Sequence, residues 1–164
     1  IWAAKDGQVG KLFFSPTHTL TLDRDALILL PRQPEDDTVF FLEKNTTDLT
    51  APDFTLRCSL RGRDESSVST DPSTSTTILD ADLLRFPLTL RRWQPGDWFC
   101  PLGLGEKRQK ISDLLVNLKI PRPLKNRVWV LESGGAIAWV LGLRVDERFR
   151  VREETRWVWE GKMG

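Results

Sequence analysis

Short runs of alternating apolar and polar residues fill the first half of the chain, and this period of two predicts β-strands. The runs that carry it are residues 11–14, 17–30, 37–44 and 54–62. Turn-rich segments separate them. Residues 65–77 follow, and this stretch is so rich in Ser and Thr that it predicts an exposed loop or hairpin tip.

The second half contains one pattern that is typical of a helix. An apolar stripe with the spacing i, i+3, i+4 and i+7 is formed by Ile111, Leu114, Leu115 and Leu118. This spacing predicts an amphipathic helix of about three turns. Pro121 ends it, because the residue before a proline disfavours the helical conformation.

Two nearly continuous apolar runs, residues 127–133 and 136–145, come after this helix. Continuous apolar character predicts strands that are covered on both faces. Gly134 and Gly135 lie between the runs and predict a tight hairpin turn, since glycine adopts positive φ easily. Residues 148–160, RFRVREETRWVWE, predict one or two further strands, because arginine alternates with apolar residues at their start.

These elements together predict a strand-rich α+β fold, with a mixed sheet or β-sandwich-like core and one main helix. Residues 1–82 read as a strand-rich linking segment, either separate or part of the same fold as residues 83–164. No signal peptide is apparent and no apolar run approaches the ~20 residues that span a bilayer, so we expect a cytoplasmic protein. The only methionine is Met163, and a chain that opens on Ile1 is expected to be a piece of a longer protein.

The net charge of +1 conceals an uneven distribution along the chain. Residues 1–82 contain 8 Lys and Arg against 14 Asp and Glu, a net of −6, whereas residues 83–164 contain 16 against 9, a net of +7. The excess lies within residues 83–127, which contain 10 against 3. Such a local excess favours a polyanionic partner, although a solvated basic surface has the same composition.

The residue types that metal sites and catalytic sites need are scarce. Cys58 and Cys100 lie far apart without a CxxC spacing, and His18 is the only histidine. This argues against zinc and favours two reduced thiols. No Ser/His/Asp, Cys/His or paired-carboxylate arrangement is apparent, so we expect neither catalytic residues nor a metal nor a cofactor in this chain.

Residues 96–121, GDWFCPLGLGEKRQKISDLLVNLKIP, raise the question of phosphate binding. Residues 101–110, PLGLGEKRQK, form a loop that we call the glycine loop. It lacks the GK[ST] ending of a nucleoside-triphosphate loop, so it has no hydroxyl for Mg²⁺. The SGG at 133–135 lacks the Asp-Ser of the SGGxDS pyrophosphate motif. The helix start beside Lys107, Arg108 and Lys110 suits the phosphate of a nucleic-acid backbone better.

Tryptophans offer a second way to contact nucleic acid. Four of them lie in apolar segments, where packing in the core is the usual role: Trp129, Trp139, Trp157 and Trp159. Trp93 and Trp98 instead flank a polar turn near two arginines. For these two, stacking on a base or on a partner stays an alternative to packing.

Several ordered motifs lie between residues 91 and 150. They are R-x-x-x-G-D at 92–97, Phe99 and Pro101 before the first glycine of the glycine loop, Ser112-Asp113 after the basic residues, Lys119 and Pro121 at the end of the helix, Arg127, and G-x-I-x-W with G-x-R-V-D-x-R-F at 135–149. In this order they resemble the C-terminal domain of bacterial tRNA(Ile)-lysidine synthetases.

The resemblance implies a strand-rich fold that is similar to a domain of phenylalanyl-tRNA synthetase. It also implies a parent enzyme that uses ATP to join free lysine to the wobble cytidine of tRNA(Ile). That ligase chemistry, with ATP and Mg²⁺, belongs to an N-terminal catalytic domain outside this sequence. The C-terminal domain is implied to bind tRNA towards the acceptor stem, without catalysis of its own.

Basic side chains of the second half are the expected tRNA contacts, through phosphate and sugar groups. They are Arg91, Arg92, Lys107, Arg108, Lys110, Lys119, Arg122, Lys125 and Arg127. The alternative interpretation is a packing or dimerisation module, for example in a homodimer, that orients a catalytic domain without touching RNA.

Overall fold

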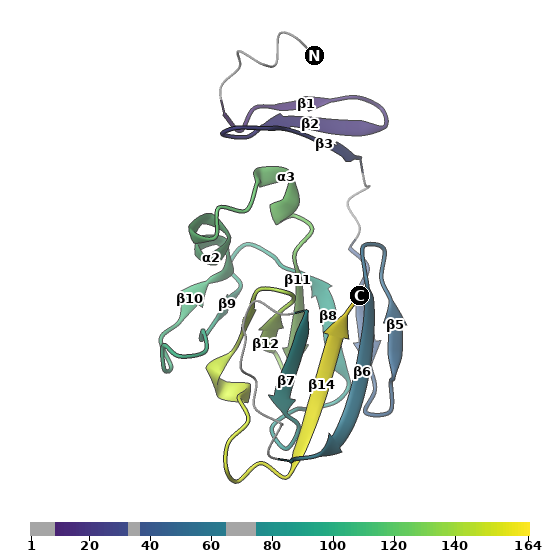
Figure 1. Cartoon of the computed structure of the whole chain (residues 1–164), viewed down its shortest axis with the longest axis vertical. Helices are drawn as coiled ribbons and strands as arrows, with labels where there is room; N and C mark the ends of the chain where they lie inside the picture. The colour runs from purple at the N-terminus through teal and green to yellow at the C-terminus, as the bar shows by residue number, and fades with distance from the viewer. Residues whose placement is uncertain (1–8, 33–36, 65–74) are drawn as a thin grey trace.

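The computed structural model describes residues 9–32, 37–64 and 75–164 of the chain. Most of the Ser/Thr-rich stretch, residues 65–74, therefore lies outside the described residues. A small three-stranded sheet lies at one end of the molecule, and two larger sheets, a two-stranded sheet and the helices form the rest (Figure 1).

The small sheet has the order β1-β2-β3 and is antiparallel throughout. Its strands are β1 (Leu12–Phe14), β2 (His18–Leu22) and β3 (Leu27–Pro31). The expectation of one continuous run over residues 17–30 is wrong, because a turn divides it. In that turn the Asp23 N–H donates to the Ala26 carbonyl at 2.8 Å, where polar residues interrupt the apolar pattern.

Two larger antiparallel sheets form the main body. The five-stranded sheet has the order β13-β12-β11-β8-β4 and the four-stranded sheet the order β5-β6-β14-β7. The bounds are β4 (Phe40–Leu42), β5 (Asp48–Thr50), β6 (Thr55–Gly62), β7 (Thr76–Asp80), β8 (Leu88–Arg92), β11 (Trp129–Ser133), β12 (Ala136–Val140), β13 (Arg144–Val145) and β14 (Trp157–Met163). Strands from the two halves of the sequence are neighbours in both sheets, because β4 pairs with β8 while β6 and β7 flank β14.

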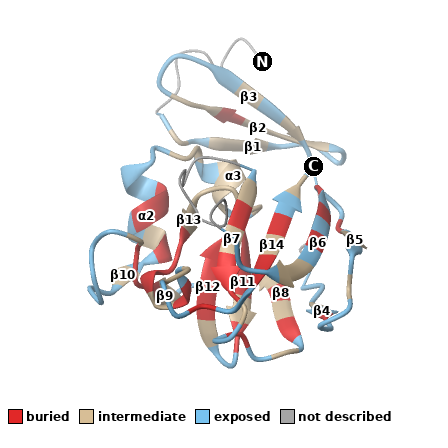
Figure 2. Cartoon of the chain, turned by 60° about the horizontal axis from the view of Figure 1, so that its bottom comes forward, coloured by how far each residue is buried: buried red, intermediate tan, exposed pale blue. Residues whose placement is uncertain are grey.

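Apolar residues on the two faces of the five-stranded sheet enter two different cores. Leu131 and Trp139 belong to the cluster that fills the space against the four-stranded sheet. Val130 and Val140 belong to a second cluster, with the helix α2 (Ile111–Asn117). This confirms the prediction that β11 and β12 are covered on both faces, and buried residues concentrate there in Figure 2.

The observed architecture confirms the predicted strand-rich α+β class with one main helix. The turn between β11 and β12 also has the expected form, with positive φ at Gly134 and Gly135. The helix is shorter than predicted, with seven residues, because Lys119 adopts φ 56° just beyond its end. A residue in this left-handed conformation ends a helix before the proline can act.

Two other expectations for the C-terminal segment are met only in part. Of the one or two strands expected over residues 148–160, β14 begins at Trp157, whereas the start of that range forms a short 3-10 helix, η1 (Glu147–Phe149), followed by irregular chain. The cause is Asp146, whose carboxylate accepts from the Arg148 N–H at 2.8 Å and caps the turn. Trp157 was expected in the core, yet it is 52% exposed at the start of β14.

Candidate nucleic-acid interface

The glycine loop connects two short strands, β9 (Trp98–Phe99) and β10 (Gln109–Lys110), that pair with each other. Two acidic side chains from the η1 turn hold its base. The Asp146 carboxylate accepts from the Cys100 N–H at 2.7 Å, and the Glu147 carboxylate accepts from the Gly103 N–H at 2.8 Å. Asp146 is 0% exposed, so Cys100, directly before the loop, is held by a hydrogen bond to a buried carboxylate.

Trp98 lies between this loop and the η1 turn, and two guanidinium groups lie over its ring. Arg108 is 4.1 Å and Arg148 5.0 Å from the ring centroid. Arg148 also donates two hydrogen bonds to Asp146, at 2.9 and 2.8 Å, and the hydrogen bond with Asp146 raises the pKa of Arg148. Arg108 has no carboxylate partner in the part of the chain that the structure describes. It is therefore a positioned cation whose donors are open to a ligand.

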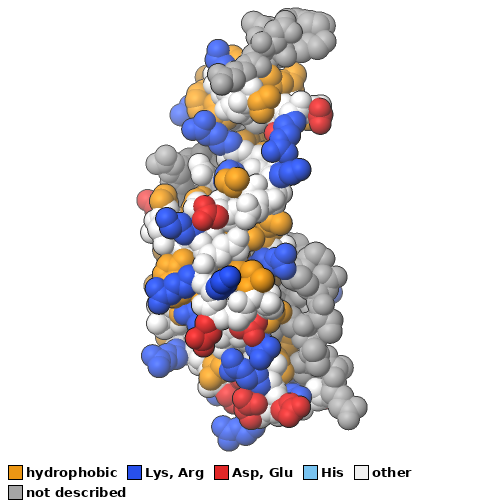
Figure 3. Space-filling view, turned by 90° about the vertical axis from the view of Figure 1, so that its left-hand side faces the viewer, with side chains coloured by type: hydrophobic (Ala, Val, Ile, Leu, Met, Phe, Trp, Pro, Cys, Tyr) orange, Lys and Arg blue, Asp and Glu red, His pale blue; other side chains and the backbone are white. Residues whose placement is uncertain are grey.

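Exposed basic side chains continue from the glycine loop past α2. We call the following set the basic edge: Lys107, Arg108, Lys110, Lys119 and Arg122. All five are exposed, and none forms an ion pair within residues 9–32, 37–64 and 75–164. Figure 3 shows this side of the molecule, with Lys and Arg side chains spread from the small sheet to the lower end and Asp and Glu side chains among them, mostly in the lower part.

Helix α2 sets the spacing of the basic edge. Lys110 is its N-cap and Leu118 its C-cap, and at 1.5 Å per residue the two caps lie about 12 Å apart. Lys119 and Arg122, in α3 (Arg122–Lys125), follow directly. At the helix start the Ile111 N–H donates to the Asp97 carbonyl at 3.0 Å, and the N-cap residue Lys110 makes no side-chain capping hydrogen bond.

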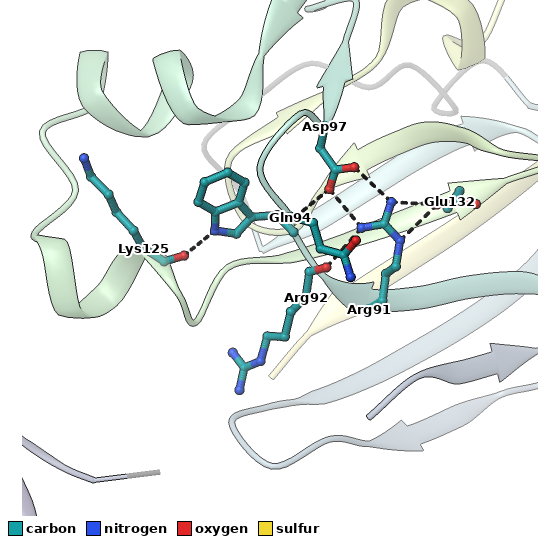
Figure 4. Close-up of polar contacts among 7 residues, drawn as sticks. Arg91, Arg92, Gln94, Asp97, Lys125 and Glu132 are labelled. Atoms are coloured by element: carbon teal, nitrogen blue, oxygen red, sulfur yellow. Dashed lines mark hydrogen bonds and ion pairs between the residues drawn. The ribbon is translucent and has the colours of Figure 1, made fainter. Parts of the chain in front are cut away.

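Arg91 is one of two predicted contact residues that the structure places inside the protein. Its guanidinium forms ion pairs with Asp97 at 2.8 Å and Glu132 at 2.9 Å, and its side chain is 18% exposed (Figure 4). The hydrogen bond with Asp97, together with Glu132, raises the pKa of Arg91. The arginine therefore ties β8 to the turn before β9 and to β11.

Arg92 is the other. It forms an ion pair with Asp53 at 2.6 Å, lies 4.4 Å from the centroid of the Trp129 ring, and has a side chain that is 15% exposed. Since neighbouring residues of a strand point to opposite faces, Arg91 and Arg92 fasten β8 on both sides.

The remaining two predicted residues lie at the junction with the small sheet. The Lys125 carbonyl accepts from the Trp93 indole N–H at 2.6 Å, while the Lys125 side chain extends away from that bond (Figure 4). The Arg127 guanidinium donates to the Pro31 carbonyl at 2.9 Å. Trp93 thus packs within the protein, and Arg127 holds β3 against the main body.

Five of the nine predicted residues therefore lie on the basic edge, and the side chains of Arg91, Arg92 and Arg127 make internal contacts. For Lys125 only the backbone carbonyl does so, and its side chain stays a predicted contact.

Sequence reasoning missed the residues that support the edge, above all Asp146 and Arg148. Their signal was present in the D-x-R spacing, where a capping aspartate can also reach an arginine two residues later. The alternation with Phe149 instead suggested a strand.

Neither cysteine has the character of a nucleophile. Both are free and buried. Burial, with the nearby charge of Asp48, raises the pKa of the Cys58 thiol to about 12, and burial also raises the pKa of Cys100. Within the described residues, moreover, no helix is long and apolar enough to cross a membrane.

Comparison with protein families gives two matches. Residues 88–160, which include the glycine loop, α2, β11–β13 and the start of β14, match the model described as the TilS substrate C-terminal domain. Residues 1–32, which include the small sheet, match the model described as the TilS substrate binding domain.

Individual relatives agree with these matches. The tRNA(Ile)-lysidine synthase of Parabacteroides distasonis is 38% identical over 95% of this chain, and that of Bacteroides thetaiotaomicron is 37% identical over 92%. The chain spans only 35% and 32% of their lengths. The crystal structure of a TilS C-terminal domain has the same fold, with a TM-score of 0.61 at 21% identity, over 76% of this chain and 97% of that one.

Proposed function

Because the chain belongs to the family of tRNA(Ile)-lysidine synthase C-terminal domains, we propose that its basic edge docks tRNA through backbone phosphates. One observation carries this proposal. The cations of the basic edge are exposed and have no acidic partner among the described residues, and Arg108 is held in place over Trp98. Side chains arranged in this way neutralise phosphates without reading bases, so they provide affinity and orientation rather than sequence specificity.

The wider role of the chain follows from its relatives. Because the relatives are named tRNA(Ile)-lysidine synthase, we propose that the chain belongs to a cytoplasmic ligase that joins lysine to tRNA(Ile). The chain spans about a third of the length of these relatives, and we propose that catalysis and the binding of ATP, Mg²⁺ and lysine belong to the rest of such an enzyme. The contribution of this chain is to hold the tRNA body while the anticodon is modified elsewhere. Recognition of duplex RNA by shape and phosphate position suits this role.

The test measures the affinity of the chain for tRNA(Ile) between 50 and 200 mM salt. For the unmodified chain we expect log K to fall steeply with log salt, because each neutralised phosphate releases counterions. The triple reversal Lys107→Glu, Arg108→Glu and Lys110→Glu is expected to weaken binding about 100-fold or more, without changing the melting temperature by more than a few degrees.

A matched control reverses three cations elsewhere: Lys44→Glu, Arg57→Glu and Lys162→Glu. Arg57 and Lys162 are paired partners on the exposed face of the four-stranded sheet, on the other side of the five-stranded sheet from α2. This triple changes the net charge equally and reports the general electrostatic effect. Arg57 also forms an ion pair with Asp48 at 3.5 Å, and because both side chains are exposed, its loss is expected to cost little stability. The proposal fails if both triples weaken binding by the same factor, or if the unmodified chain does not bind. A packing or dimerisation module would instead show unchanged affinity and an altered elution volume on a sizing column.

A further inference from the structure

A cleft separates the small sheet from the main body at α3. It has a volume of about 470 Å³ and is lined by Val9, Gly10, Lys11 and Arg122. We call it the hairpin cleft. Two of its four lining residues are basic, and they come from opposite sides: Lys11 directly precedes β1, and Arg122 is the first residue of α3.

Hydrogen bonds fix the wall that carries Lys11. The Gly10 N–H donates to the Leu22 carbonyl at 2.8 Å, and the Thr21 hydroxyl donates to the Lys11 carbonyl at 3.1 Å. Thr21 is 2% exposed, so this bond is shielded from water. The Lys11 ammonium lies 5.3 Å from the centroid of the Phe13 ring, which limits the directions in which it can extend.

A second set of contacts fixes the opposite wall. The Arg127 guanidinium donates to the Pro31 carbonyl at 2.9 Å, so the second residue after α3 holds the end of β3. Helix α3 also packs directly against β2. Because both walls are fastened, the separation of Lys11 and Arg122 is set by the fold rather than by flexible side chains alone.

The charges of the cleft are not balanced from within. In the described part of the chain, neither Lys11 nor Arg122 forms an ion pair with a carboxylate. Two like charges that face one shared space repel each other, and an anion between them converts that repulsion into attraction. An arginine and a lysine together are well suited to phosphate, since the guanidinium presents a planar pair of donors and the ammonium a point charge.

The cleft also continues the basic edge. Arg122 belongs to both, and Lys119 lies three residues before it. A ligand that lies along the basic edge from the glycine loop therefore reaches the hairpin cleft next. A free phosphate would occupy the cleft alone. A phosphate within a polymer would also place neighbouring phosphates over the remaining cations of the basic edge.

We propose that the hairpin cleft holds a backbone phosphate of the same RNA, so that the bound RNA crosses the junction between the small sheet and the main body. This inference rests on the proposed function and deepens it. It adds Lys11 to the RNA contacts, and it gives the junction fixed by Arg127 a role in aligning the two parts of the binding surface.

The experiment compares the unmodified chain with the double variant Lys11→Gln and Arg122→Gln in titrations of tRNA(Ile) at 50 to 200 mM salt. Loss of two phosphate contacts is expected to reduce the slope of log K against log salt by about 1.5, and to weaken binding roughly 10-fold at 100 mM. A matched pair, Lys44→Gln and Lys162→Gln, removes the same charge elsewhere and is expected to change the affinity less than threefold.

A conservative exchange, Lys11→Arg with Arg122→Lys, is expected to keep both the slope and most of the affinity. Hydrogen exchange of the β1–β3 amides verifies that the small sheet stays folded in every variant. The inference is overturned if the unmodified chain binds steeply while the Gln pair loses no more than the control pair. It is equally overturned if the conservative exchange loses as much as the Gln pair with the sheet intact. Failure of the unmodified chain to bind tRNA would instead overturn the proposed function.

Discussion

Two groups of basic residues that look equivalent in the sequence have different surroundings in the structure. Arg91 and Arg92 on β8 face three carboxylates and an indole, and their side chains are 18% and 15% exposed. The basic edge, defined by Lys107, Arg108, Lys110, Lys119 and Arg122, is exposed and has no acidic partner in the described segments. The first group stabilises the fold, and the second is available to a ligand.

The difference shows that the net charge of a segment overestimates how many of its basic side chains can contact a ligand. Asp97 lies six residues beyond Arg91, but Glu132 and Asp53 are distant in sequence and meet the arginines only through the pairing of β8 with β11 and the packing of the two sheets. A cation in a buried ion pair attracts an anionic ligand only weakly, because a carboxylate already compensates its charge. Substitutions in the two groups should therefore affect different measurements.

The largest effect is expected from Arg91→Leu. Removing the guanidinium leaves Asp97 and Glu132 facing each other at 15% and 22% side-chain exposure, so two poorly solvated carboxylates lose their shared counter-ion. We expect the free energy of unfolding in urea to fall by about 3 kcal/mol. Affinity for tRNA, measured below the unfolding transition, is expected to change less than twofold.

The neutral triple variant Arg91→Leu, Asp97→Asn and Glu132→Gln serves as its control. It removes the uncompensated carboxylates together with the arginine, and is expected to recover at least half of the lost stability. If Arg91→Leu left the free energy of unfolding unchanged but weakened tRNA binding tenfold, Arg91 would belong to the RNA interface. It would then not differ in role from the residues of the basic edge.

A smaller effect on stability is expected when Arg92 and Arg108 are each changed to lysine. Both arginines lie over a tryptophan, Arg92 over Trp129 and Arg108 over Trp98, yet only Arg92 is half-buried with a carboxylate at 2.6 Å. Lysine keeps the charge but lacks the planar guanidinium, which can lie over an aromatic ring and hydrogen-bond to a carboxylate at the same time. Thermal and urea unfolding should show a loss of about 1.5 kcal/mol for Arg92→Lys and less than about 0.5 kcal/mol for Arg108→Lys. Equal losses at both positions would contradict the comparison.

Sequence patterns predicted the features of this fold that depend on near neighbours. The apolar stripe of α2, the two doubly covered strands and the Gly134-Gly135 turn all follow from local spacing, and the structure contains them. The end of α2 was misjudged because a left-handed Lys119 leaves no compositional signal. The turn at Asp146 resembled a strand because its arginines alternate with apolar residues.

The candidate site was less predictable than the fold. Which cations are free depends on strand pairing that sequence spacing does not reveal, as the contacts of Arg92 with Asp53 and of Arg127 with the Pro31 carbonyl demonstrate. Lys11 belongs to the acidic half of the chain, where no sequence pattern marks it as a contact residue, although the fold brings it opposite Arg122. Long-range topology therefore decides the membership of the surface, while local composition gives its approximate position.

Replacement of Trp98 by leucine tests how far positioning matters within the basic edge. The ring holds Arg108 at 4.1 Å, so its loss frees the guanidinium without removing charge. We expect about fivefold weaker tRNA binding with an unchanged salt slope, since the number of cations is the same. Trp98→Phe keeps an aromatic face and should restore most of the affinity. A changed slope, or no rescue by phenylalanine, would show that Trp98 acts in another way.

The smallest effect is expected from Lys107→Gln, and it is the most direct measure of a single cation on the basic edge. Lys107 is exposed and contributes no ion pair in the described residues, so its removal should leave the free energy of unfolding within about 0.5 kcal/mol. Loss of one phosphate contact should lower the slope of log K against log salt by about 0.9 and weaken binding two- to threefold at 150 mM salt. Lys44→Gln, an exposed cation on the turn after β4, should change neither quantity. If the two lysines behaved alike, the basic edge would be a solvated surface and not a docking site, because position and not charge alone separates them.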